Sequence, residues 1–184
     1  MKKILIALVV LGIMLTGCAK EEVEKVDISE LNSYRVDMSS YSGMNSVDHS
    51  FKGITPEEFL NAQKDGASGI FYLGYTGCHI CQNAVSLMNE AAIQSGVYIY
   101  YIDCYNELYP LLDYEEDFIE TLKPMLRKDE NGKYGIYTPH VFAMVNGEYV
   151  DYEIGLGDYD GSEKAREKAI NRYKEIMSYF IEAQ

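Results

Sequence analysis

The chain has 184 residues, a formal net charge of −13 and four cysteines, so it fits one domain or one domain with an appendage. Its 47% hydrophobic and 24% charged residues are ordinary for a globular protein and exclude disorder of the whole chain. The acidic composition argues against nucleic acid as a partner and against electrostatic docking on anionic lipid, because both need clustered Lys and Arg.

The first residues are typical of an export signal. Two lysines precede an apolar run, Ile4–Leu15, that contains a single glycine. A helix of this length rises about 18 Å, which is too short for a hydrocarbon core of about 30 Å. The segment therefore predicts a signal peptide over residues 1–17. Residues 15–18 are LTGC, which resembles a bacterial lipobox. This resemblance implies lipid attachment to Cys18 and a location outside the cytoplasm on a cell membrane. The alternative is an ordinary secretory signal in which Cys18 is incidental.

The next segment differs in composition from the remainder of the chain. Residues 18–50 are polar and weakly periodic, which predicts a flexible tether. A folded domain is expected over residues 51–184. Its first helix begins near Pro56, because Thr55 and Glu58 have the spacing of a capping box and proline suits the first helical position.

Apolar periodicity locates the remaining elements. Runs rich in aromatic and β-branched residues predict strands at 68–75, 97–103, 140–145 and 148–154. Apolar stripes predict helices at 81–95, 113–127 and 162–182, and Pro124 should kink or end the second. Asn146-Gly147 predicts a hairpin turn. The order of these predicted elements indicates an α/β fold with a mixed central sheet. The core has the order β-α-β-α-β-β-α, and an extra N-terminal helix precedes it.

Two cysteines, Cys78 and Cys81, lie where a predicted buried strand ends and a helix begins. The first N–H groups of a helix have no internal partners and the macrodipole is positive there, so a thiolate at Cys78 would be stabilised. Such a thiolate attacks a disulfide sulfur, and Cys81, one turn later, resolves the mixed disulfide.

Two other interpretations of the pair are weaker. A structural disulfide would close a very small loop, which constrains the unfolded chain little. A zinc site usually needs four ligands, and only Cys104 and three histidines remain as further candidates. Redox chemistry is therefore preferred.

The predicted core resembles a thioredoxin-fold protein over residues 52–182. The resemblance rests on the CxxC after a strand, and on Thr138-Pro139 before an Asn-Gly hairpin and a final helix. It implies that Pro139 is cis and lies against the CxxC, that Thr138 contacts substrate, and that the substrates are protein disulfides or dithiols. No organic cofactor or metal is required. The sequence around the pair, GYTGCHICQNAVSLMNEAA, is also similar to thioredoxin-like bacteriocin transport accessory proteins.

Four positions depart from the thioredoxin pattern. Gly77 stands where the usual tryptophan precedes the first cysteine. Tyr72 replaces a buried aspartate that assists proton transfer to the second cysteine. The dipeptide is His79-Ile80, and an imidazolium at His79 would stabilise the Cys78 thiolate unless the ring points to solvent.

Three further residue types give weaker indications of function. Cys104 ends a predicted parallel strand, so we expect it at the sheet edge that holds the CxxC, as a third redox thiol or, preferably, a small buried hydrophobe. His140 could approach the site from Pro139, and His49 is expected to have no role. Acidic clusters such as residues 113–117 indicate solvated faces.

The leading hypothesis is a lipid-anchored, extracytoplasmic thiol–disulfide oxidoreductase. One alternative is a non-catalytic accessory module that uses the same peptide-holding surface in secretion. The other is a copper metallochaperone, from whose CxxxC pattern this CxxC departs. The sequence does not determine the direction of electron flow, because the reduction potential of the cysteine pair is the sum of several opposing effects.

Overall fold

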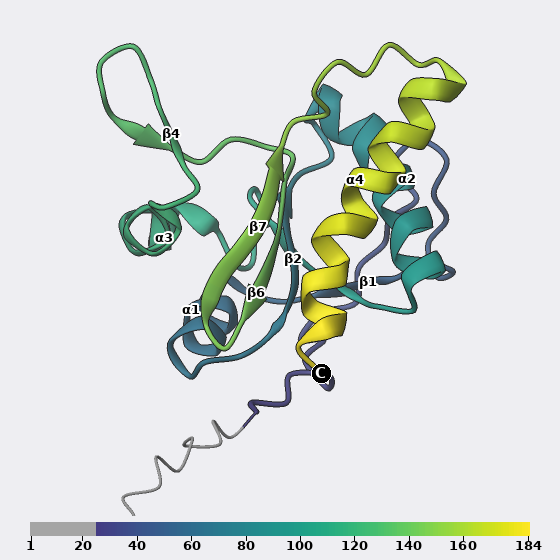
Figure 1. The fold of residues 1–184 in the computed structure, drawn as a ribbon. Coiled ribbons are helices and arrows are strands. Elements are labelled where there is room, and N and C mark those ends of the chain that lie inside the picture. Colours follow the sequence, from purple (N-terminus) through teal and green to yellow (C-terminus); the bar gives the residue numbers. More distant parts are fainter. Residues whose placement is uncertain (1–24) are drawn as a thin grey trace, which may run out of the picture.

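The structure is a computed structural model in which residues 25–184 are described (Figure 1). The predicted signal peptide and Cys18 lie outside these residues. The elements in chain order are β1 (Phe51–Gly53), α1 (Pro56–Lys64), β2 (Gly69–Gly74), α2 (His79–Ser95), β3 (Ile99–Asp103), the 3₁₀ turn η1 (Leu111–Tyr114), α3 (Glu115–Leu122), β4 (Arg127–Lys128), β5 (Tyr134–Gly135), β6 (His140–Val145), β7 (Glu148–Ile154) and α4 (Glu163–Glu182).

A five-stranded sheet with the order β1-β3-β2-β6-β7 forms the centre of the domain. Strands β1, β3 and β2 are parallel, whereas β6 runs antiparallel to β2 and continues through a hairpin into β7. Helices α2 and α4 cover one face, while α1 and α3 lie on the other (Figure 1). This arrangement is a thioredoxin-like fold, so the predicted fold class is confirmed, with β1 and the small β4–β5 hairpin as additions.

Local sequence explains where the elements start and stop. The Thr55 hydroxyl accepts a hydrogen bond from the Glu58 N–H and the Glu58 carboxylate accepts one from the Thr55 N–H, so the predicted capping box starts α1. Gly96 ends α2 at a φ of 69°, in the left-handed region that favours glycine. Helix α3 ends at Leu122, short of Pro124, and is therefore shorter than the predicted 113–127.

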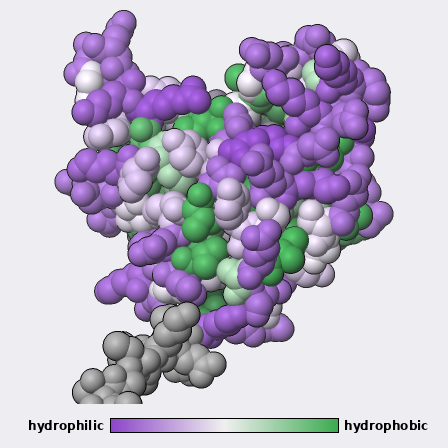
Figure 2. Space-filling view, in the orientation of Figure 1, coloured by the Kyte–Doolittle hydropathy of each residue, from purple (hydrophilic) through white to green (hydrophobic). Residues whose placement is uncertain are grey.

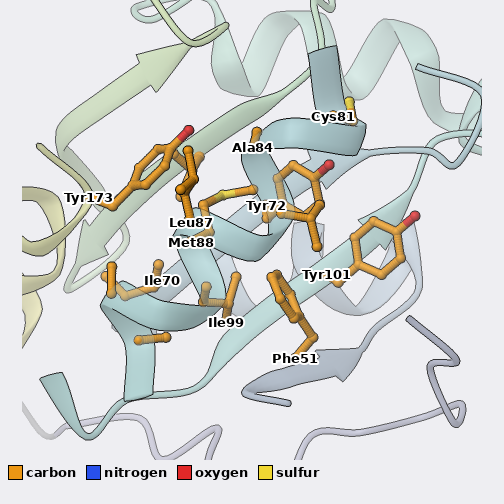
Figure 3. Packing of buried hydrophobic residues seen from close by; sticks show 14 of the residues in the cluster. Phe51, Ile70, Tyr72, Cys81, Ala84, Leu87, Met88, Ile99, Tyr101 and Tyr173 are labelled. Atoms are coloured by element: carbon orange, nitrogen blue, oxygen red, sulfur yellow. The ribbon is translucent and has the colours of Figure 1, made fainter. Parts of the chain in front are cut away.

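Strand β2 divides the interior into two cores. All six of its residues are buried, which explains why its sequence is a continuous apolar run. Because side chains alternate along a strand, Ile70 and Tyr72 join the core beneath α2 and α4, whereas Phe71 and Leu73 join the one beneath α1 and α3. Figure 3 shows the first core, where tyrosine rings pack among aliphatic side chains.

The predicted flexible tether over residues 18–50 is wrong for the part that the structure describes. Val26 forms a bridge with Ala67, and Tyr34 forms one with Gly53. Met38 and Tyr41 are buried in the core beneath α2. The apolar residues of this segment occur singly between polar ones, and only Tyr34, Val36 and Met38 form a short alternating run, yet these side chains pack onto the folded domain.

The surface is predominantly hydrophilic on the face seen in Figure 2. Hydrophobic patches on this face lie over the β6–β7 hairpin and beside α4. Within residues 25–184, no helix combines the length and the apolarity that crossing a bilayer requires.

Candidate active site

The cysteine pair lies at the N-terminal end of α2, as predicted. Cys78 is the N-cap residue, and its Sγ accepts a hydrogen bond from the Cys81 N–H at 3.1 Å. The two cysteines form a disulfide, with their Cα atoms 5.1 Å apart. Cys78 is 7% exposed and Cys81 is fully buried, so Cys78 is the sulfur that a second protein can reach. Reduction would leave the Cys78 sulfur at the positive end of a helix, which stabilises a thiolate.

The segment before β6 completes the site. The Thr138–Pro139 peptide bond is cis, as the resemblance implies. The Thr138 carbonyl oxygen lies 3.8 Å from the Cys78 Sγ. The Pro139 carbonyl accepts a hydrogen bond from the Gly155 N–H at 2.8 Å, which ties this turn to the end of β7. Two segments separated by 60 residues therefore meet at the sulfur.

The dipeptide between the cysteines faces solvent. His79 is exposed and Ile80 is 46% exposed. No hydrogen bond joins the His79 ring to another residue in the described range 25–184. Of the two expectations for His79, the structure therefore supports a ring directed to solvent, and Ile80 adds an apolar side chain to the rim of the site.

Gln82 is a site residue that the sequence patterns do not reveal. Its side-chain amide donates hydrogen bonds to the Ser40 carbonyl at 3.1 Å and to the Thr76 carbonyl at 2.7 Å, and accepts one from the Ser42 N–H at 3.0 Å. Gln82 thus fastens the N-terminal segment to the turn that precedes Cys78. The only sequence signal is its position directly after Cys81, in the first turns of the helix.

Tyr72 lies beneath the cysteine pair with a hydroxyl that has no partner. The side chain is fully buried, and its hydroxyl has no hydrogen bond. Figure 3 shows this hydroxyl directed toward the turn of α2 that holds Cys81. Gly74 makes the placement possible, because a Cβ there would overlap the Tyr72 ring. Burial raises the pKa of Tyr72 well above its usual value, so the phenol stays neutral and cannot accept a proton as an aspartate would.

Replacing Tyr72 with phenylalanine is expected to raise the free energy of unfolding by about 1 kcal/mol, because the change removes a buried hydroxyl that lacks a partner. Tyr101→Phe is the matched control. The Tyr101 hydroxyl lies 2.8 Å from the Tyr41 hydroxyl, so its loss should lower stability by about the same amount. Urea denaturation of both variants measures the two effects. A loss of stability in Tyr72→Phe would contradict the conclusion that the Tyr72 hydroxyl has no hydrogen-bond partner.

His140 follows Pro139 but does not join the site. Its ring packs against Phe142 and Tyr152, is fully buried, and has no hydrogen bond at either nitrogen. Burial, with a smaller contribution from the charge of Arg127, lowers the pKa of His140 to about 4. The expectation that His140 could approach the cysteines is therefore not met, and the ring is neutral at physiological pH.

This buried imidazole should make stability depend on pH. The unfolded chain binds a proton below about pH 6.5, whereas the folded chain does so only near the lowered pKa of about 4. Stability should therefore fall as the pH falls from about 6.5 to 4, by roughly 3 kcal/mol in total. In His140→Leu this loss of stability at low pH should vanish, whereas the control His79→Ala, at an exposed position, should retain it. Urea unfolding at pH 7.5 and 4.5 tests the difference, and an equal fall in stability for wild type and His140→Leu would contradict it.

Cys104 lies at the predicted edge of the sheet. Its N–H donates to the Gly74 carbonyl at 2.9 Å, directly before the turn that leads to the cysteine pair. Its thiol is free, and burial, reinforced by the Asp103 carboxylate, raises the pKa of Cys104 to about 12. A thiol held in its protonated form is a poor nucleophile. Cys104 is partly exposed, and its raised pKa favours the packing interpretation over a third redox thiol.

Two other features bear on the predicted site. His49 has a structural role that the sequence does not indicate. Its Nδ1 accepts a hydrogen bond from the Phe51 N–H at 3.2 Å, and its Nε2 lies 3.2 Å from the Val36 carbonyl oxygen. It therefore stabilises the N-terminal segment. In the part of the chain from residue 25 onward, no three His, Cys, Asp or Glu side chains are grouped so that they could hold a metal ion.

Comparison with known proteins yields structural similarity alone. No protein-family model matches the chain, and neither does any curated protein. Oxidized thioredoxin O2 from Arabidopsis thaliana aligns with 71% of this chain and 94% of its own, at 16% identity and a TM-score of 0.46. Thioredoxin from Trypanosoma brucei brucei aligns with 70% of this chain and 92% of its own, at 12% identity and a TM-score of 0.44. The fold assignment rests on the chain's own strand order and helix positions.

Proposed function

We propose that the protein is a thiol–disulfide oxidoreductase that acts on cysteines of other polypeptides through Cys78 and Cys81. One observation supports this above the others. The slightly exposed Cys78 sulfur lies at the N-terminus of α2, 3.8 Å from the carbonyl of the residue before a cis-proline, with Cys81 buried behind it. An attacking sulfur, a resolving sulfur and a backbone segment that a substrate chain can contact are thus assembled at one edge of the sheet.

In the reductive direction, the Cys78 thiolate attacks one sulfur of a substrate disulfide, and the other substrate sulfur leaves as a thiolate. The Cys81 thiol then loses its proton and attacks the Cys78 sulfur. The second substrate sulfur leaves, the Cys78–Cys81 disulfide forms, and the substrate has gained two electrons. The oxidative direction is the reverse. Because Tyr72 is neutral, the Cys81 proton leaves to water or to the departing substrate thiolate.

The proposed location is the outer side of a bacterial cell membrane, with a lipid on Cys18. Its support is the sequence LTGC after an apolar run too short to span a bilayer. Fractionation of cells that produce Cys18→Ala tests this part. The variant should leave the membrane fraction, and unchanged processing and membrane association would contradict the proposed anchor.

The experiment for the activity is turnover of a disulfide-bonded protein by the purified protein, with dithiothreitol as the terminal reductant, and the reverse reaction with reduced protein and oxidized glutathione. Catalysis in either direction supports the proposal. If neither reaction is accelerated, and Cys78→Ala/Cys81→Ala cells retain every phenotype of the wild type, the chain is instead a non-catalytic accessory module.

A further inference from the structure

A cavity of about 230 Å³ lies next to the cysteine pair. Its lining includes Tyr75, Cys104, Leu111, Leu112, Glu115 and Thr138. Pockets that enclose small-molecule ligands usually measure about 300–1,000 Å³. This cavity is smaller, and its size suits one large side chain of another polypeptide.

The cavity and the reactive sulfur share a wall. Thr138 lines the cavity, and its carbonyl oxygen lies 3.8 Å from the Cys78 Sγ. The ring of Tyr75, also in the lining, packs against that of Tyr105 with centroids 4.5 Å apart, which joins the turn before Cys78 to the loop after β3. A chain whose cysteine reacts at Cys78 and whose backbone follows Thr138 therefore places a neighbouring side chain at the cavity mouth.

The loop after β3 exposes large apolar side chains near this mouth. Tyr105 and Leu112, which both line the cavity, are 66% and 67% exposed. Apolar side chains gathered around a cavity, and rimmed by polar residues, are typical of a protein-binding surface.

The same stretch of chain is strongly acidic. Residues 103–122 contain seven Asp or Glu residues and no Lys or Arg. Glu115 lines the cavity itself. This charge favours a cationic partner, and it disfavours a second copy of this chain, whose net charge is −13.

We propose that this cavity and the loop over residues 104–115 select the substrate. The preferred substrate segment has a large apolar side chain and a Lys or Arg within a few residues of the cysteine that reacts with Cys78. The apolar side chain enters the cavity beside Leu111 and Leu112, and the cation lies against Glu115. This inference rests on the proposed function, because it assigns the substrate class of the same site.

The test compares three disulfides as substrates of the full-length protein. Two are peptides in mixed disulfide with glutathione that differ only beside the cysteine, where one has Phe and Lys and the other has Ser and Glu. The third is oxidized glutathione alone. We expect kcat/KM for the Phe-Lys peptide to exceed that for the Ser-Glu peptide by about tenfold or more, a ratio typical of a hydrophobic pocket that gains or loses an apolar group.

Two variants separate the apolar from the electrostatic contribution. Leu112→Ser should reduce the preference for the Phe-Lys peptide severalfold, and Glu115→Gln should weaken the salt dependence of its reaction. Ile93→Ser, at a 60% exposed position near the far end of α2, is the control and should behave as wild type. Ile93→Ser should also turn over oxidized glutathione at the wild-type rate.

The outcomes distinguish this inference from the function on which it rests. If all three disulfides react but the two peptides have equal kcat/KM, the proposed selectivity is wrong while the oxidoreductase proposal stands. If Leu112→Ser and Ile93→Ser lose the preference equally, the cavity is not its source. If none of the three disulfides reacts while a protein disulfide or dithiol does, the proposed selectivity is wrong and the oxidoreductase proposal stands. If no substrate reacts in either direction, both proposals are overturned.

Discussion

Replacing Cys78 with serine is expected to reduce turnover of a protein disulfide to the uncatalysed rate. The hydroxyl of serine keeps the size and polarity of the N-cap group but cannot form a disulfide. Cys78 is also the more accessible member of the pair, at 7% exposed, so the fully buried Cys81 cannot replace it as the attacking sulfur. Steady-state kinetics with the same substrate before and after the substitution measure the effect.

Cys104→Ser is the matched control, because it removes the third thiol at the same edge of the sheet. Burial raises the pKa of Cys104 to about 12, so this variant should retain turnover close to that of the wild type. Equal losses in the two serine variants would show that Cys104 takes part in exchange. Turnover that persists in Cys78→Ser would mean that another group attacks the substrate.

Replacing Met38 with alanine is expected to lower the free energy of unfolding by about 2–5 kcal/mol, the usual range for a fully buried large apolar side chain. Met38 is 0% exposed and packs into the core beneath α2, although its neighbours in sequence are polar. Urea denaturation at neutral pH measures the change.

Val47→Ala in the same segment is the control. Val47 is 66% exposed, so its truncation should change stability by less than about 0.5 kcal/mol. If Met38→Ala were equally neutral, residues 25–50 would be the flexible tether that their composition predicts. A large difference between the two variants would show that the segment is part of the folded domain.

The parts of the site that local sequence encodes can be predicted. Cys78 and Cys81 mark the start of a helix after a buried strand, and the structure places them there. The thioredoxin resemblance predicts Thr138-Pro139 beside them, and it lies there in the cis form. The cysteine pattern can be recognised because it is a contiguous stretch at a change from strand to helix. The cis form of Thr138-Pro139 is predicted by the resemblance alone, because most X-Pro bonds in folded proteins are trans.

The features that the sequence does not reveal depend on contacts between distant segments. Tyr41 meets Tyr101 through their hydroxyls across 60 residues, and Gln82 contacts Ser40 across 42. Neither contact leaves a periodic pattern. His140 follows the proline in sequence, but its ring packs on Phe142, two residues along the same face of the strand, instead of approaching the sulfurs.

The loop after β3 illustrates the same limit. Its acidic residues indicate a solvated face, and the acidic first turn of α3 is indeed largely exposed, while Phe118 and Leu122 of that helix are buried. Sequence alone does not show that the loop bends back so that Tyr105 packs on Tyr75 and leaves a cavity beside Thr138.

The most direct measurement of the central claim is the capture of a substrate on Cys78. In Cys81→Ala the resolving sulfur is absent, so a mixed disulfide formed at Cys78 should persist. Cells that produce this variant, quenched in acid, should yield polypeptides bound to Cys78 that a reductant releases and mass spectrometry identifies. The double variant Cys78→Ala/Cys81→Ala should yield none. If the single variant captures no more protein than the double variant, Cys78 does not exchange disulfides with other polypeptides, and the proposed function is wrong.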